Sequence, residues 1–510
     1  MLSQIASGPP PACPAPFNLA AYVLAPATTS PERIALLLVG PSGAERWSYA
    51  KLEAAVRGTG AGLLAMGLVP GDRVLMRLAN SVDFPILFLG AITAGLVPVP
   101  TSAQLTTPEV TALAVELAPK LIAAGPGVAL PADPPCPVLD LDGLRALRTR
   151  APCAWDMGDP DRLAYVVFTS GSSGRPRGVL HAHRAVWARR RMWEGWYGLT
   201  PSDRLLHAGA LNWTFTLGTG LLDPWAMGAT ALVPAAGVAP AQLPLLLRRH
   251  DVTIFAAAPG LYRQMLKAGE RLALPRLRHG LSAGEKMPEV TRRAWQAATG
   301  TPVHEAFGMS ECSTFISGAP GRPAPGGSAG YVQRGRQVAL IGPEGTPVPQ
   351  GSPGVIAVHR SDPGLFLGYL GAEAETRARF SGDWFLTGDI GVMAEDSAVT
   401  YLGRDDDMLN AGGVRVSPLE IEAALNEHPE IAESAACEVS PREGVSVIAA
   451  FYVAAHDLDE ATLAAFAAER LARYKQPRIW RRVTALPRGA NNKLLRRVLR
   501  ETAMSAAEAL

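Results

Sequence analysis

The chain has 510 residues, 48% of them hydrophobic, and a formal net charge of +2 at pH 7. This length allows large buried cores and suggests roughly three folding units. The near-neutral charge gives no reason to expect a nucleic-acid partner. The 5 cysteines show no metal-ligand spacing, and an odd number of them suits reduced thiols in a cytoplasmic protein.

The N-terminal segment, MLSQIASGPPPACPAPF, lacks a basic start and a continuous apolar core. We therefore expect an extended lead-in segment and no signal peptide. The most apolar stretch, Phe84 to Val99, is interrupted by prolines and is shorter than the ~20 residues needed to span a bilayer. We expect a buried helix there, no membrane span and a cytoplasmic location.

Apolar runs predict β-strands at 73–76, 164–168, 252–257 and 338–341. They alternate with segments of helical period, which is typical of α/β layers around largely parallel sheets. The predicted strands of the second half are shorter. Gly and Pro are frequent at 318–330 and 342–354, which indicates the loops and hairpins of a β-rich third subdomain.

A run of four charged residues, Arg404 to Asp407, predicts a boundary between residues 1–404 and a small domain of residues 405–510. Soon after it, Ser417, Pro418 and Glu420 predict the N-cap, first-turn proline and capping-box acid of a helix. Its expected inward residues are Leu419, Ala424 and Leu425. In the large domain, we expect the run Arg189-Arg190-Arg191 on a solvated helix face.

The stretch YVVFTSGSSGRPRGV at 165–179 joins a strand-like run to a loop of Gly, Ser, Thr and Arg. Such a loop can bind phosphate, because glycines let backbone N–H groups face an anion, hydroxyls donate and arginines add charge. The residues concerned are Thr169, Ser170, Gly171, Ser172, Ser173, Gly174, Arg175 and Arg177. The loop is not a Walker motif, and a flexible linker is the competing interpretation.

Four further segments follow in a fixed order: SAGE at 282–285, FGMSE at 307–311, TGD at 387–389 and GRDDD at 403–407. With the loop, they resemble the adenylate-forming (ANL) superfamily, which includes acyl-CoA synthetases, peptide-synthetase adenylation domains and luciferases. The resemblance implies an α/β fold. Its large N-terminal domain would have two layered α/β subdomains and a β-rich subdomain, followed by a small mobile α+β C-terminal domain.

The resemblance also implies an ATP site. Arg177 stands where the family usually has Lys, and guanidinium supplies the charge in a planar fork. Glu311, beside Ser310, would coordinate Mg2+ on the triphosphate. Asp389 would accept hydrogen bonds from the ribose, and Arg404 would contact ribose or phosphate. The adenine would lie between Gly284-Glu285 and the ring of Phe307, next to Gly308.

In the small domain, the resemblance implies that Lys493 bridges the carboxylate and the α-phosphate during adenylation. Relatives carry Ser-Gly or Thr-Gly before this lysine, whereas this chain has Asn491-Asn492, and a basic helix face is the alternative reading. The small domain would then rotate about Asp406. Gly412 and Gly413 would face the pantetheine tunnel, although Gly-Gly is more often a turn.

The expected acyl pocket is lined by Trp213, Thr214, Phe215, Ala283 and Gly308. Acetate-specific relatives put a tryptophan at the last position, so glycine would leave depth for a medium-chain, alicyclic or aromatic acid. Trp213 and Phe215 would supply flat walls, and a plain core role for them is equally consistent. The segment SAGEKMP looks most like benzoate and medium-chain acyl-CoA ligases.

The leading hypothesis is therefore a carboxylate:CoA ligase that forms an acyl-CoA through an acyl-adenylate, with ATP, Mg2+ and CoA. Its partners would be a small carboxylic acid, ATP and CoA. A homodimer is a further possibility that the sequence does not decide. One alternative is an enzyme that loads a carrier protein in trans. Another is a non-catalytic nucleotide-binding pseudoenzyme. A nucleophilic role for Cys312 is not favoured.

Overall fold

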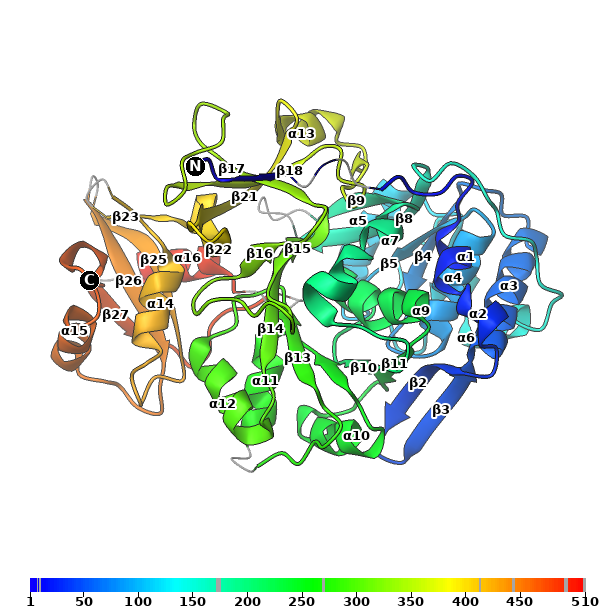
Figure 1. Ribbon diagram of the computed structural model, residues 1–510, viewed down its shortest axis with the longest axis horizontal. Coiled ribbons are helices and arrows are strands. Elements are labelled where there is room, and N and C mark those ends of the chain that lie inside the picture. The colour runs from blue at the N-terminus through cyan, green and yellow to red at the C-terminus, as the bar shows by residue number, and fades with distance from the viewer. Residues whose placement is uncertain are drawn as a thin grey trace.

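The computed structural model describes residues 1–6, 8, 11–170, 176–267, 271–411, 414–442, 445–489 and 494–507 (Figure 1). Most of the large domain is built on one 15-stranded sheet. Its parallel half contains β2 (Ile34–Gly40), β11 (Thr230–Pro234), β10 (Arg204–His207), β12 (Ile254–Ala256), β13 (His279–Ala283) and β14 (Val303–Met309). The helices between these strands are α8 (Thr214–Leu217), α9 (Asp223–Met227), α10 (Leu243–Arg249), α11 (Pro259–Leu266) and α12 (Glu289–Thr299).

The antiparallel half continues the same sheet. It contains β15 (Ser313–Ser317), β16 (Gly330–Val332), β22 (Ala398–Arg404), β21 (Trp384–Met393), β18 (Pro353–His359), β17 (Gln337–Ile341) and β1 (Gln4–Ala6). Burial alternates strictly along β21, as expected for a strand with one face on the core. The predicted β-rich part is therefore present, but its strands share a sheet with the parallel strands.

A second α/β unit holds the parallel strands β5 (Val97–Pro100), β4 (Arg73–Arg77), β6 (Leu121–Ala124) and β7 (Val138–Leu139). Its helices are α3 (Tyr49–Ala65), α4 (Asp83–Thr93), α5 (Thr107–Leu117) and α6 (Leu141–Leu147). Helix α4 is buried throughout, which confirms the buried helix, although Val97 to Val99 belong to a strand. In the part of the chain that the structure describes, no helix has the length and apolar character to span a membrane.

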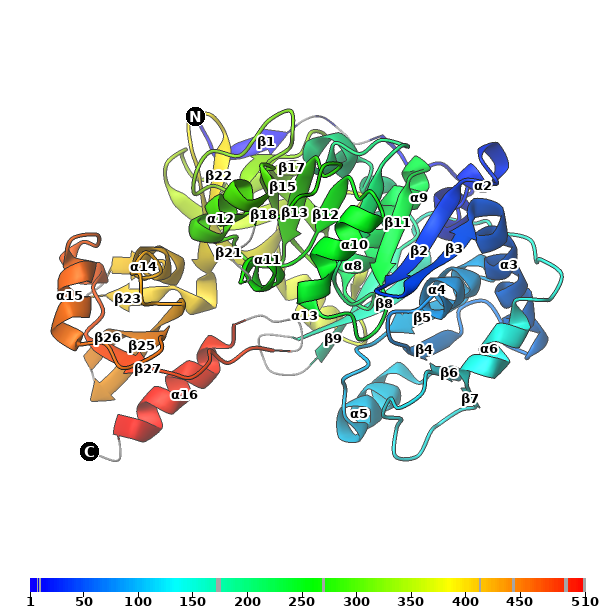
Figure 2. The same ribbon diagram turned by 90° about the horizontal axis from the view of Figure 1, so that it is seen from below.

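The small C-terminal unit lies at one end of the molecule in both views (Figures 1 and 2). It comprises β23 (Leu409–Ala411), β24 (Val414–Val416), α14 (Pro418–Leu425), β25 (Glu433–Arg442), β26 (Val445–Val453), α15 (Glu460–Ala468), β27 (Ile479–Arg482) and α16 (Arg496–Ala507). Two hydrophobic clusters within this unit form its own core.

Helix α14 begins with Pro418 as predicted, but two details differ. The Ser417 hydroxyl donates to the carbonyl of Leu402 and makes no capping bond to the helix. The inward face is Ile421, Glu422 and Leu425, and Leu419 is only half-buried. Glu422 can be buried because Arg496 pairs with it at 2.6 Å, a long-range contact that local periodicity cannot reveal.

Candidate active site

The loop proposed to bind phosphate connects β8 (Leu163–Ser170) to β9 (Pro176–Ala182), which pair with Thr169 opposite Arg177. The side chain of Arg177 forms an ion pair with Glu375 of α13 (Glu373–Ala378). The Arg177 guanidinium also lies 5.7 Å from the ring centroid of Tyr369. Gly171, Ser172, Ser173, Gly174 and Arg175 lie outside the described residues, as does the side chain of Ser170.

Glu311 lies in the turn between β14 and β15 and is only 9% exposed. The Tyr369 hydroxyl donates a 2.7 Å hydrogen bond to its Oε1. Burial, and then the Glu311 carboxylate, raise the pKa of Tyr369, so the phenol stays a donor at neutral pH. Arg177, Tyr369 and Glu311 therefore form one continuous set of contacts. Tyr369 was not predicted, because a contact across 58 residues leaves no local signal.

The residues expected to bind the nucleoside form a second cluster. Asp389 on β21 faces Arg404 on β22. The Tyr401 hydroxyl donates to Oδ1 of Asp389 at 3.2 Å, and the Tyr401 ring lies 5.2 Å from that of Phe307. The structure thus brings Asp389, Arg404 and Phe307 together through Tyr401. Tyr401 was not predicted from the sequence.

The segments expected to hold adenine and acid are in direct contact. Gly284 has φ +92°, and a Cβ added there would lie 2.6 Å from the indole of Trp213. The rings of Trp213 and Phe215 meet edge to face at 5.2 Å. Phe215 and Ala283 belong to one buried cluster, against which Trp213 packs, so one wall carries both segments. Thr214 follows as the first residue of α8.

Gly308 lies at a register shift between β14 and β15. A Cβ at this position would lie 2.2 Å from the carbonyl oxygen of Ser313 and 2.4 Å from the Cα of Thr314. Backbone atoms cannot move aside as a flexible side chain can, so the close strand approach alone requires glycine. The proposed effect of Gly308 on pocket depth therefore stays a prediction.

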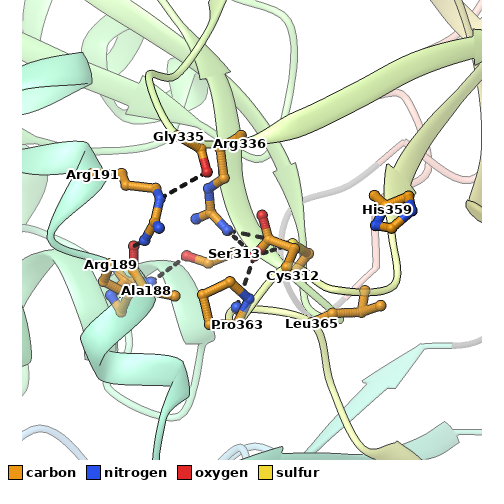
Figure 3. Close-up of polar contacts among 12 residues, drawn as sticks. Ala188, Arg189, Arg191, Cys312, Ser313, Gly335, Arg336, His359, Pro363 and Leu365 are labelled. Carbon is orange, nitrogen blue, oxygen red and sulfur yellow. Dashed lines mark hydrogen bonds and ion pairs between the residues drawn. The ribbon is translucent and has the colours of Figure 1, made fainter. Parts of the chain in front are cut away.

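The arginine run at 189–191 corrects an expectation. Arg189 is 6% exposed, pairs with the buried Asp223 at 2.6 Å and donates to the hydroxyl of Ser313 (Figure 3). Arg191 is half-buried and donates to the carbonyl of Gly335 at 3.1 Å. Only Arg190 is exposed, so the solvated-face prediction is wrong for its neighbours. The Asp223 carboxylate makes burial of the Arg189 charge feasible.

A buried ion pair supports the turn that carries Glu311. Arg336 and Asp362 are 2.5 Å apart, and Arg336 also lies 3.8 Å from the Cys312 sulfur (Figure 3). Burial raises the pKa of the Cys312 thiol well above its usual value. A protonated, buried thiol is a poor nucleophile, which agrees with a structural role for Cys312.

The small unit contacts the large domain next to the SAGE segment. Arg488 lies 3.5 Å from Glu285 and 2.6 Å from Glu433, which in turn pairs with Arg263 of α11 at 3.4 Å. A bridge joins Arg488 to Leu494, so the segment between them starts and ends beside the large domain. Lys493, Gly412 and Gly413 lie outside the described residues. Asp406 falls in a short 3-10 helix, and its side chain is likewise not described.

Two family models match the chain. The model described as "AMP-binding enzyme" matches residues 24–370, and the model described as "AMP-binding enzyme C-terminal domain" matches residues 420–493. The first match includes Phe307, Glu311 and Tyr369, whereas Asp389, Tyr401 and Arg404 lie between the two matched ranges. The second covers most of the small unit.

Named relatives align over almost the whole chain. A 3-hydroxybenzoate–CoA ligase of Aromatoleum sp. (strain CIB) is 31% identical over 491 residues, 90% of this chain and 92% of the relative. A benzoate–CoA ligase of Thauera aromatica is 31% identical over 484 residues, 89% of this chain and 90% of the relative. The crystal structure of the anthranilate CoA ligase AuaEII with anthranoyl-AMP matches with a TM-score of 0.89 at 26% identity, over 97% of this chain and 99% of that one.

Proposed function

The chain belongs to the family of AMP-binding enzymes and is an AMP-forming carboxylate:CoA ligase, and we propose that its acid is aromatic and of the benzoate type. The observation that carries the proposal is the apolar wall of Trp213, Phe215 and Ala283 against Gly284. Flat rings on such a wall suit an aromatic acid. Two of the named relatives act on benzoates, in agreement with this choice.

Adenylation joins two anions, so the site must neutralise phosphate charge and align the carboxylate with the α-phosphorus. We assign phosphate binding to Arg177 and the preceding loop, and metal binding to Glu311. A single carboxylate suits Mg2+, which keeps waters and takes its other ligands from phosphates. Tyr369 occupies Oε1 of Glu311, and no donor in the described ranges reaches Oε2, which leaves that oxygen for the cation. When bound, Mg2+ would neutralise the triphosphate.

The remaining site residues have assigned roles in the same proposal. Asp389 and Arg404 would bind the ribose side, and Phe307 would pack on the adenine. Lys493 would bridge the carboxylate and the α-phosphate. This role is supported by the position of Arg488 and Leu494, which bring the ends of its segment to the large domain beside Glu285.

We also propose that the domain boundary lies at residue 404 and that the small unit rotates about Asp406. The pantetheine path would run beside Gly412 and Gly413. A separate core in the small unit supports the division. A cytoplasmic location is proposed too, and it accords with 5 cysteines that are all free thiols. A homodimer stays a prediction for sedimentation analysis.

The test is product analysis with ATP, Mg2+ and a panel of acids, with and without CoA. The panel contains acetate, hexanoate, octanoate, cyclohexanecarboxylate, benzoate and substituted benzoates. We expect AMP and aroyl-CoA from the benzoates, and little product from acetate. Preferential turnover of octanoate would contradict the aromatic assignment. Acyl-AMP without acyl-CoA would contradict CoA as the acceptor.

A further inference from the structure

The ion pair between Arg177 and Glu375 joins the proposed phosphate loop to a helix outside it. Arg177 is the second residue of β9, directly after the loop, and Glu375 lies in α13. Their side chains are 26% and 34% exposed. Both are therefore accessible to a ligand that approaches the loop.

Glu375 is held at this position by the structure around it. The hydroxyl of the next residue, Thr376, accepts a 2.9 Å hydrogen bond from the backbone N–H of Tyr369 and donates to the carbonyl of Ala372 at 3.0 Å. Tyr369 is in turn bonded to Glu311. The backbone next to Glu375 is thus tied to the segment that carries Tyr369, and the Glu375 side chain pairs with Arg177.

A guanidinium group offers the same planar fork of donors to a carboxylate and to a phosphate. The two anions therefore compete for it. An arginine cannot lose its proton near neutral pH, so the competition ends only when one anion leaves. Any free energy of the internal pair is subtracted from the affinity for the external anion.

We propose that Glu375 occupies Arg177 in the nucleotide-free enzyme and is displaced by the triphosphate, so that this pair lowers the affinity for ATP. The inference rests on the proposed function, because it takes the ligand of Arg177 to be ATP. It assigns to Glu375 a role that neither its position in α13 nor the loop sequence indicates. Glu375 tunes affinity and takes no part in the chemical steps.

The test compares Glu375→Gln with Glu373→Gln in the full-length protein. Both substitutions remove one negative charge from α13, but Glu373 is exposed and makes no ion pair with any described residue. Titration calorimetry with MgATP, without acid, gives the dissociation constant. We expect Glu375→Gln to bind roughly two- to fivefold more tightly, the range for a partly exposed ion pair, and Glu373→Gln to match the wild type.

Equal tightening in both variants would mean a general charge effect and would overturn the inference. Unchanged or weaker binding by Glu375→Gln would also overturn it. In an Arg177→Gln background, Glu375→Gln should bring no gain, and a persisting gain would contradict the pair as the cause. Wild-type protein that binds no ATP would refute the proposed function itself, which is a different result from bound ATP with no effect of Glu375.

Discussion

At the scale of single residues, the Tyr369 hydroxyl makes the hydrogen bond that orients Glu311. Tyr369→Phe keeps the ring and removes only this bond. Hydrogen bonds to charged groups contribute roughly 1.5–3 kcal/mol, so we expect about tenfold weaker half-saturation by Mg2+ in ATP–pyrophosphate exchange. Tyr331→Phe is the control, because its hydroxyl contacts Asp396 at 3.4 Å, away from Glu311. An unchanged Mg2+ requirement in Tyr369→Phe would show that Glu311 is oriented by other means.

The ordered motifs led to candidate site residues, among them Glu311, Asp389 and Phe307, and their roles stay predictions. Sequence analysis missed Tyr369, Tyr401 and Glu375, because each contacts the site from a distant segment and carries no motif of its own. The exposure of Arg189 was predicted wrongly for the same reason. A run of three arginines indicates solvent exposure, and only the long-range partner Asp223 explains why the first of them is buried.

At the scale of elements, the hairpin of β14 and β15 depends on Gly308. Gly308→Ala would force a Cβ against the backbone of Ser313, and overpacking of this kind costs typically 1–3 kcal/mol. We expect a lower urea midpoint and loss of adenylation. Gly326→Ala is the control, since a Cβ there meets nothing within 4 Å. Equal midpoints in the two variants would mean that the strands can separate at no cost.

Strands and buried helices were largely predictable from apolar runs. The run at 164–168 lies within β8, and the run at 338–341 within β17. What the runs could not predict is how the strands assemble. The β-rich segments were expected as a subdomain of their own, yet β15 pairs with β14 and extends the parallel sheet. Strand pairing over long sequence separations depends on packing that a local pattern does not contain.

At the scale of the whole molecule, three buried histidines predict how stability depends on pH. Burial lowers the pKa of His181, His183 and His207 to about 3, from 6.5 in the unfolded chain. Between these two pH values the unfolded state binds more protons than the folded state. The contribution of the neutral histidines to the free energy of unfolding is therefore complete above pH 6.5 and is lost as pH falls toward 3. Each histidine accounts for up to roughly 1.4 kcal/mol per pH unit.

Urea midpoints at pH 7.5, 6.5 and 5.5 would measure this dependence. We expect a clear drop between the last two values, and a smaller drop in His181→Phe, which has one histidine fewer and keeps a ring against Tyr165. A midpoint that is constant or rises on acidification would contradict neutral buried histidines.

The contacts between the two parts of the molecule also bear on the mechanism. Arg488 reaches Glu285, and Glu433 reaches Arg263, so half-buried ion pairs hold the small unit against the SAGE segment. Such pairs are individually weak, which is compatible with the proposed rotation of the small unit.

In this mechanism, one site forms an acyl-adenylate and then transfers the acyl group to CoA. A single-turnover experiment with excess enzyme, ATP, Mg2+ and benzoate tests it most directly, with CoA added only after the first products are measured. We expect enzyme-bound benzoyl-AMP and one equivalent of pyrophosphate, then conversion to benzoyl-CoA and AMP when CoA is added. Formation of benzoyl-CoA with ADP and phosphate, or no reaction until CoA is present, would contradict this mechanism.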